Sequence, residues 1–322
     1  MGAVTVPYVI ALDGGGSKTD AVAVALDGTV LGRVSAGGSS PHLLGLAPSV
    51  AVVDSLVRQL STGDVPVHVG IYLSGLDLDR EVDAFRDAVA DLPWAAGSIA
   101  IHNDLFALLR AGTSAPDAAA VVCGTGLNAL AIRADGEVAR FLALGPISGD
   151  WGGGTGIGEL ALWFAARDED GRGEPTTLTA AVASTFGFAT IEELTKALHL
   201  GAVPMIDLAR LSPIVFTHAQ AGDAIARHIV DRQAEEIVLM AAAALGRLGL
   251  AEATVPVVLG GGVLRARDAR LLAGVKAGLA TRAPGAQVVV VDAAPIVGAA
   301  LLALESAGAP PEAVDRARAE LG

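Results

Sequence analysis

One arrangement occurs twice in this chain: an apolar strand, a glycine-rich loop, a second strand, an Asp-Gly turn and a returning strand. The first copy covers residues 6–34 with its turn at Asp27-Gly28, and the second covers residues 118–144 with its turn at Asp135-Gly136. Asp-Gly between apolar runs is a strong signal for a β-hairpin. The repeat therefore predicts two related α/β domains, each with a glycine loop at a strand end.

The length and composition support two domains. A single hydrophobic core rarely grows beyond about 250–300 residues, and 52% of the 322 residues are apolar while 18% are charged. Further strands are predicted at residues 98–101, 255–259 and 287–291, and helices at 47–60, 105–111, 158–166, 177–184, 191–198, 224–248 and 295–306. We expect the last helix to pack back on the first sheet. This gives a first domain of residues 1–112 plus 296–322 and a second of residues 113–295.

The charge and the cysteine content argue against several functions. The net charge is −13, whereas proteins that bind nucleic acid usually carry a basic surface. A phosphorylated ligand stays possible, because backbone N–H groups can bind anions without lysine. The one cysteine, Cys123, cannot form an intramolecular disulfide or a Cys-rich metal site within one chain. Charged residues and Pro295 interrupt the longest apolar stretches, so we expect no membrane span. We also expect no signal peptide and a cytoplasmic location.

The first glycine loop reads Asp13-Gly14-Gly15-Gly16-Ser17-Lys18-Thr19. Its Ser-Lys-Thr ending is that of a P-loop, but the glycines of that motif do not fall at the required positions, and a hairpin follows instead of a helix. Successive N–H groups of a tight hairpin can still bind phosphate oxygens. A carboxylate at position 13 would then hold Mg²⁺, partly through water. An ordinary glycine hairpin is the competing interpretation.

Two later loops follow apolar strands in the same way. Gly124-Thr125-Gly126 is a common pattern by itself. Its position in the second repeat, however, is equivalent to that of the first glycine loop in the first repeat. Gly260-Gly261-Gly262 follows a Val-rich strand, where it allows close approach to a flat ligand such as adenine or simply forms a tight turn. Cys123 is better explained as a small buried residue than as a nucleophile, since no histidine lies nearby in sequence.

Asp104 lies between an expected strand and an expected helix. At the carboxyl end of a strand in an open α/β sheet, a carboxylate faces the ligand crevice. There it could accept a proton from an attacking hydroxyl, although helix capping is the alternative role for an aspartate at this position. The glycine-rich segment at 149–158 is either a linker or the start of a substrate region, and Trp151 within it packs either on a sugar face or in the core.

Together these motifs resemble a known superfamily. Residues 13–19, 123–126 and 260–263 are similar to the phosphate-1, phosphate-2 and adenosine motifs of sugar kinases, actins and heat-shock chaperone ATPases. The resemblance implies an α/β fold with two ribonuclease H-like, actin-like ATPase domains around a nucleotide cleft. Within the superfamily, the chain resembles the N-acetylglucosamine kinase branch of the BadF/BadG-type ATPase family over nearly its whole length.

This resemblance implies a role for each motif residue. Asp104 matches the general base on the sugar 6-hydroxyl, and Asp13 would contact Mg²⁺ partly through water. The residues that would bind ATP are Gly14, Gly15, Gly16, Ser17, Lys18, Gly124, Thr125, Gly126, Ala219, Gly260, Gly261 and Gly262. The residues that would contact the sugar are His42, Asp104, Asn128, Gly145 and Asp150.

The implied activity is an ATP- and Mg²⁺-dependent kinase for N-acetylglucosamine or glucosamine, acting as a homodimer without nucleic acid or membrane partners. Pro41 stands where the family often has Asn, and Trp151 where it has an acidic residue, so N-acetylmuramate and other sugars stay open. A non-kinase ATPase or a sugar-responsive regulatory protein is the alternative. A reductase-activating ATPase is less consistent, because those relatives bridge an iron–sulfur cluster with cysteines that this chain does not have.

Overall fold

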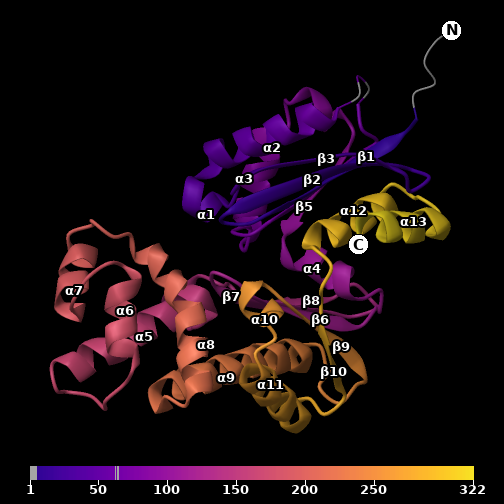
Figure 1. Ribbon diagram of the computed structural model, residues 1–322. Coiled ribbons are helices and arrows are strands. Elements are labelled where there is room, and N and C mark those ends of the chain that lie inside the picture. The colour runs from indigo at the N-terminus through magenta and orange to yellow at the C-terminus, as the bar shows by residue number, and fades with distance from the viewer. Residues whose placement is uncertain (1–5, 62, 64) are drawn as a thin grey trace. The chain divides into compact units, whose positions relative to one another are not determined.

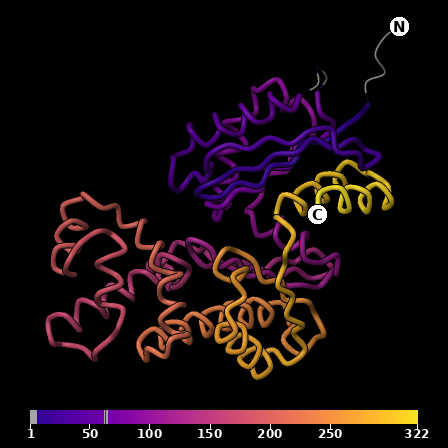
Figure 2. The backbone as a smooth tube through the Cα atoms, in the orientation of Figure 1, coloured from indigo at the N-terminus to yellow at the C-terminus, as the bar shows by residue number. Residues whose placement is uncertain are grey.

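The computed structural model describes residues 6–61, 63 and 65–322 (Figure 1). The chain divides into two compact units. The first combines the segment that ends at Ala120 with Val291–Gly322, and the second is Val121–Val290. Figure 2 shows how the chain leaves the first unit, completes the second and returns to the first with its last two helices.

The first unit is built on a five-stranded sheet in the order β3-β2-β1-β4-β5. Its strands are β1 (Tyr8–Gly14), β2 (Lys18–Ala25), β3 (Val30–Gly37), β4 (His68–Leu73) and β5 (Ser98–Asn103). The first three strands pair antiparallel, and β4 and β5 run parallel to β1. The carboxyl ends of β1, β4 and β5 therefore meet at one edge of the sheet.

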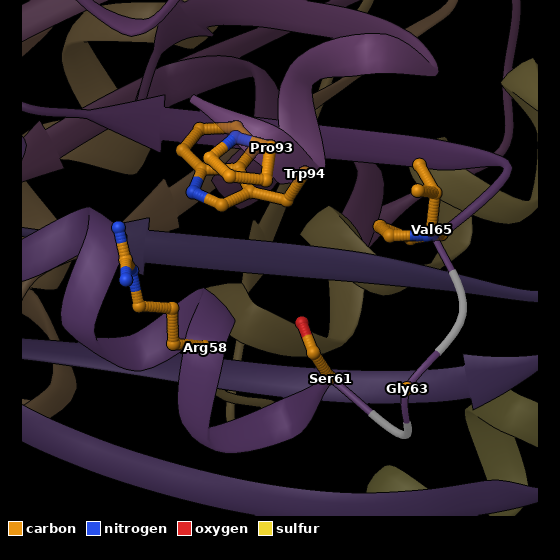
Figure 3. Close-up of a pocket in the computed structure, with 7 residues that line it drawn as sticks. Arg58, Ser61, Gly63, Val65, Pro93 and Trp94 are labelled. Carbon is orange, nitrogen blue, oxygen red and sulfur yellow. The ribbon is translucent and has the colours of Figure 1, made fainter. Parts of the chain in front are cut away.

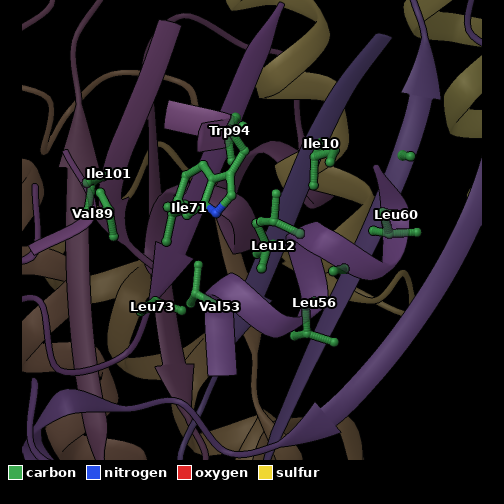
Figure 4. Close-up of a cluster of buried hydrophobic side chains, with 14 of the residues drawn as sticks. Ile10, Leu12, Val53, Leu56, Leu60, Ile71, Leu73, Val89, Trp94 and Ile101 are labelled. Atoms are coloured by element: carbon green, nitrogen blue, oxygen red, sulfur yellow. The ribbon is translucent and has the colours of Figure 1, made fainter. Parts of the chain in front are cut away.

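Side chains of β1 are buried on both faces of this sheet, which explains its continuous apolar run. Ile10 and Leu12 pack in the cluster shown in Figure 4, under α2 (Leu46–Leu60) and α3 (Asp79–Val89). Val9 and Ala11 pack on the opposite face with α4 (Leu105–Gly112), α12 (Pro295–Ser306) and α13 (Pro311–Leu321). The prediction that the helix at 295–306 packs back on the first sheet is confirmed.

The second unit repeats this strand order around its own central strand, β10-β9-β6-β7-β8. The strands are β6 (Ala118–Cys123), β7 (Leu127–Ile132), β8 (Val138–Arg140), β9 (Val255–Gly260) and β10 (Ala286–Val290). The repeat read from the sequence is thus confirmed strand for strand. The returning strand is shorter than predicted, because β8 ends at Arg140 instead of residue 144. Ala143 has a φ of 51°, which an extended strand cannot accommodate.

The remaining elements are mostly helical. They are α1 (Pro41–Leu44), α5 (Gly153–Glu169), α6 (Leu178–Thr185), α7 (Ile191–His199), α8 (Ser212–Ala221), α9 (Ala224–Arg247), α10 (Gly262–Arg265) and α11 (Ala269–Arg282). Three short 3₁₀ helices are η1 (Pro93–Ala96), η2 (Gly145–Ser148) and η3 (Met205–Leu211). Within the described ranges, none of these helices combines the length and the apolar character that a membrane crossing requires.

Helix α5 corrects two expectations from the sequence. It begins at Gly153 rather than at residue 158, so much of the glycine-rich segment is helix and not a linker. A Cβ on Gly158 would overlap the carbonyl oxygen of Leu208 in η3. Glycine is therefore required in this helix because the backbone of η3 lies directly against it. Helix α8 (Ser212–Ala221) is not among the helices predicted from the sequence.

The packing of α12 on α4 gives a stability prediction. A Cβ on Gly298 would overlap Ala107 O and lie 2.5 Å from Ala111 N. We expect Gly298→Ala to lower the free energy of unfolding by about 1–3 kcal/mol, because the two helices must separate. The control is Gly246→Ala in α9, where a Cβ meets no described atom within 4 Å. That variant should gain about 0.5 kcal/mol through helix propensity. Denaturant unfolding of both variants is the measurement, and equal stability for the two would contradict the packing argument.

Candidate active site

The first glycine loop is fixed by backbone hydrogen bonds at the carboxyl end of β1. The N–H of Gly15 donates to Lys18 O (2.9 Å), and the N–H of Ser39 donates to Gly15 O (3.0 Å). The N–H of Ser74, directly after β4, donates to Gly14 O (2.8 Å). The loop is therefore held by two neighbouring segments of the first unit.

A buried group of hydroxyls joins this loop to the segment that carries His42. The hydroxyl of Thr19 lies 2.8 Å from both Gly37 O and Ser39 Oγ, and Ser49 Oγ donates to Ser39 O. Thr19, Ser39 and Ser49 are each fully buried. Buried polar networks that are satisfied in this way make a local structure rigid. By contrast, Ser17 is exposed, and the ammonium of Lys18 pairs with Asp20 Oδ1 at 2.8 Å.

Asp104 follows β5 at the same edge of the sheet and is half-buried. The capping alternative fails for its side chain, because Asn103 Oδ1 accepts the N–H of Leu105 (3.0 Å) in its place. Loss of water around the carboxyl, together with the negative charge of Asp77, raises the pKa of Asp104 to about 7. A general base is most effective when its pKa lies near the working pH. Asp104 has that property.

Asp77, whose negative charge acts on Asp104, belongs with Asn103 and Glu81 to a group of polar side chains that the sequence did not single out. Asn103 Nδ2 donates to Asp77 Oδ1 (2.9 Å), and Glu81 Oε1 lies 3.0 Å from His42 Nε2. His42 Nδ1 lies 3.8 Å from Asp77 Oδ2. The residue predicted to contact the sugar, His42, therefore lies next to Asp77. The signal available in the sequence was Asp77, which follows an apolar strand as Asp104 does.

In the second unit, three glycine segments pack together. The N–H of Gly154 donates to Gly124 O (2.7 Å) at the start of α5. Gly153 has a φ of 70°, and a Cβ there would lie 2.5 Å from Gly126 Cα. Gly261 has a φ of 90°, and a Cβ there would overlap Cys123 O. At Gly124 and Gly126 themselves, a Cβ meets no atom of the described residues within 4 Å, so these two positions face open space.

One cavity brings four of the predicted residues together. It has a volume of about 220 Å³, and its lining includes Thr125, Gly126, Gly145 and Asp150. It is also lined by Trp151, for which the sequence left a sugar contact as one alternative, and by Thr155 and Glu159, which the sequence did not single out. Thr155 Oγ1 is buried without a hydrogen-bond partner in the described part of the chain, as suits a group that bonds a ligand.

The position of Trp151 bears on an alternative left by the sequence. The guanidinium of Arg232 lies 4.1 Å from the centre of the indole ring. A Cβ on Gly156 would lie 3.4 Å from the same ring. The indole therefore packs against α5 and α9 and also lines the cavity of Gly145 and Asp150, so the structure is compatible with both roles.

The other predicted residues of the second unit lie outside that cavity. Ala219 lines a second cavity, of about 330 Å³, with Gln220, Arg227 and Asp268. Asn128 lies on β7, where its Oδ1 accepts the N–H of Ala129 at 2.7 Å. Gly260, Gly261 and Gly262 lie at the end of β9 and the start of α10.

A further cavity of about 230 Å³, shown in Figure 3, is a poor candidate site. Its lining includes Arg58, Val65, Pro93 and Trp94, and it contains none of the predicted site residues. Val65 and Trp94 precede β4 and β5, so the cavity lies at the amino ends of these strands. Ligands of open α/β sheets bind at the carboxyl ends instead.

The duplicated sheet with glycine loops at its strand ends is the α/β fold shared by sugar kinases and actin-like ATPases. The chain belongs to the BadF/BadG/BcrA/BcrD ATPase family, which matches residues 10–303.

Similar proteins span nearly the same length. A Dictyostelium discoideum protein named N-acetyl-D-glucosamine kinase is 30% identical over 92% of this chain and 98% of its own. A Clostridium acetobutylicum protein named N-acetylmuramic acid/N-acetylglucosamine kinase is 27% identical over 80% of this chain and 85% of its own. The solved structure of a Chromobacterium violaceum protein, described provisionally as an N-acetylglucosamine kinase, has a TM-score of 0.72 at 25% identity. It covers 92% of this chain and 99% of that one.

The environment of Cys123 gives a reactivity prediction. The side chain is fully buried in β6, and burial raises the pKa of its thiol to about 12. Since the thiolate is the reactive form, a thiol reagent at pH 8 should react at least about a hundredfold more slowly with native protein than with protein in denaturant. A native rate close to the denatured rate would contradict the placement of Cys123 in the core.

Proposed function

We propose that the protein is an ATP-dependent sugar kinase that phosphorylates the 6-hydroxyl of an amino sugar, N-acetylglucosamine or glucosamine. The observation that carries this proposal is Asp104, a carboxyl at the strand-end edge of the first sheet that does not cap its helix and has a pKa of about 7. Family membership supports the use of ATP, and the names of the relatives support a sugar as acceptor.

The phosphates of ATP would be bound chiefly by backbone N–H groups. In the proposal these come from residues 14–18 in the first unit and 124–126 in the second, apart from the N–H groups of Gly15 and Gly124, which donate within their own loops. Ala219 and residues 260–262 would border the nucleoside. The open space at Gly124 and Gly126 supports close approach of a phosphate there. Asp13 would hold Mg²⁺, an ion that is commonly bound by one or two carboxylates together with phosphates and water. When bound, Mg²⁺ supplies positive charge next to the phosphates.

Asp104 would accept the proton of the sugar hydroxyl as that oxygen attacks the γ-phosphorus. The bond from the γ-phosphorus to the bridging oxygen breaks, and ADP leaves. Phosphoryl transfer depends mostly on positioning and electrostatic stabilisation, which rigid glycine loops provide. His42, Asn128, Gly145 and Asp150 would orient the sugar, and the unpartnered hydroxyl of Thr155 adds a hydrogen-bonding group to the cavity of Gly145 and Asp150. The homodimer expected from the family stays a prediction.

Acceptor specificity is the first test. ADP release from MgATP should rise at least about tenfold with N-acetylglucosamine or glucosamine, because the hydroxyl then replaces water as the acceptor. Mannosamine, N-acetylmuramate and glucose are tested as well, because Pro41 and Trp151 differ from the residues that the family has at these positions. Stimulation by no sugar would refute the kinase and favour the non-kinase ATPase or the regulatory protein.

Replacement of the base is the second test. Asp104→Asn should lower kcat with the best sugar by about 10²–10⁴-fold, because the amide cannot accept the proton. Binding of ATP and the thermal unfolding midpoint should stay near the native values, which separates loss of chemistry from loss of structure. The control is Asp87→Asn, which changes an exposed carboxyl on α3 that has no proposed role. Near-normal turnover in folded Asp104→Asn would show that the base is misassigned.

A further inference from the structure

We infer that Asp77, held by Asn103, is a positioning residue that tunes Asp104 as a base. The inference deepens the proposed function and rests on it. It gives the carboxylate of Asp77 an indirect role in the reaction, without contact to the sugar hydroxyl or to the γ-phosphorus.

Asn103 makes the physical connection between the two carboxylates. Its Nδ2 donates to Asp77 Oδ1 (2.9 Å), while its Oδ1 accepts the N–H of Leu105 (3.0 Å) at the start of α4. Asn103 is 3% exposed and Asp77 is 9% exposed. One buried amide therefore links Asp77 to the helical turn on which Asp104 lies, and both ends of the link are satisfied.

The backbone around Asp77 is fixed as well. Glu81 Oε2 accepts the N–H groups of Asp77 (3.0 Å) and Leu78 (2.9 Å) at the start of α3. Gly75, two residues earlier, has a φ of 78°, and a Cβ there would lie 2.7 Å from Ser40 Oγ. Few alternative positions are thus open to the Asp77 carboxylate, which is what a group that tunes its neighbour requires.

Charged groups from several elements gather at this end of the first sheet. Asp77 follows β4, Glu81 belongs to α3, His42 to α1, and Asp13 lies near the end of β1. Among the described residues, Asp77 is the charged group that adds to the effect of burial in raising the pKa of Asp104. His102, next to Asn103, instead stacks on Tyr72 and lies against Phe106. A like charge next to a carboxyl disfavours its ionised form, so Asp77 holds Asp104 protonated to a higher pH.

Asp77→Asn is the decisive variant, because the amide keeps an oxygen that accepts from Asn103 and loses the charge. The acid limb of kcat/KM reports the ionisation of the base in the free enzyme. Its midpoint should fall by about 1 pH unit in Asp77→Asn, since the base then ionises more easily. The matched control is Glu81→Gln, which removes one negative charge from the same cluster but keeps an acceptor for the two N–H groups. Its midpoint should match the native one.

Asn103→Ser tests the link itself. Serine retains an acceptor for the N–H of Leu105 and removes the donor to Asp77. We expect kcat to fall by about tenfold through loss of positioning. An unchanged midpoint in Asp77→Asn, or an equal shift in Glu81→Gln, would overturn the inference.

A readout that needs no turnover separates this inference from the proposed function. In protein labelled with ¹³C, the carboxyl carbon of Asp104, assigned with Asp104→Asn, is titrated by NMR without substrate. Its midpoint should lie near 7 in the native protein and about 1 unit lower in Asp77→Asn. This result would uphold the link between the two carboxylates even if no sugar were phosphorylated. A native midpoint near the ordinary aspartate value of about 3.9 would overturn it.

Discussion

Backbone-to-backbone contact between glycine segments is the constraint on which the candidate site depends. Gly38 lies against Gly16, Gly153 against Gly126, and Gly261 against Cys123, each so closely that a Cβ would overlap main-chain atoms. These contacts fix the loops at the strand ends. Because packing takes up one set of glycines, a second set, Gly124 and Gly126, can face open space, although the N–H of Gly124 donates to Gly126 O. Open space beside backbone is what the proposed binding of ATP by a chain with a net charge of −13 requires.

The same strand-end edge sets the chemistry of Asp104. Parallel pairing of β1, β4 and β5 brings the first glycine loop, Asp77 and Asp104 to one side of the first sheet. Burial and the nearby Asp77 then raise the pKa of the Asp104 carboxyl to about 7. A fold that aligns strand ends thus brings a glycine loop and a carboxyl of raised pKa to one edge of the sheet, as the proposed kinase requires.

Much of this could be predicted because it is encoded locally. The two hairpins, the strand that ends before Asp104 and the helix at 295–306 all follow from apolar periodicity and turn residues. The start of α5 and the contribution of Asp77 could not be predicted in the same way. The glycines that precede residue 158 favour a loop in the sequence, whereas glycine at 158 is explained by Leu208, fifty residues later, which lies directly against it. Asp77 gains its importance from Asn103, a partner from another strand. Such contacts between distant segments leave no pattern in one sequence.

The position of the transferred phosphate tests the central claim most directly. The product of MgATP and N-acetylglucosamine, or of glucosamine if that is the better acceptor, is examined by ¹H–³¹P correlation NMR. The account predicts a phosphomonoester whose phosphorus couples to the two protons on C6. Coupling to the anomeric proton, or inorganic phosphate as the only new phosphorus species besides ADP, would contradict it.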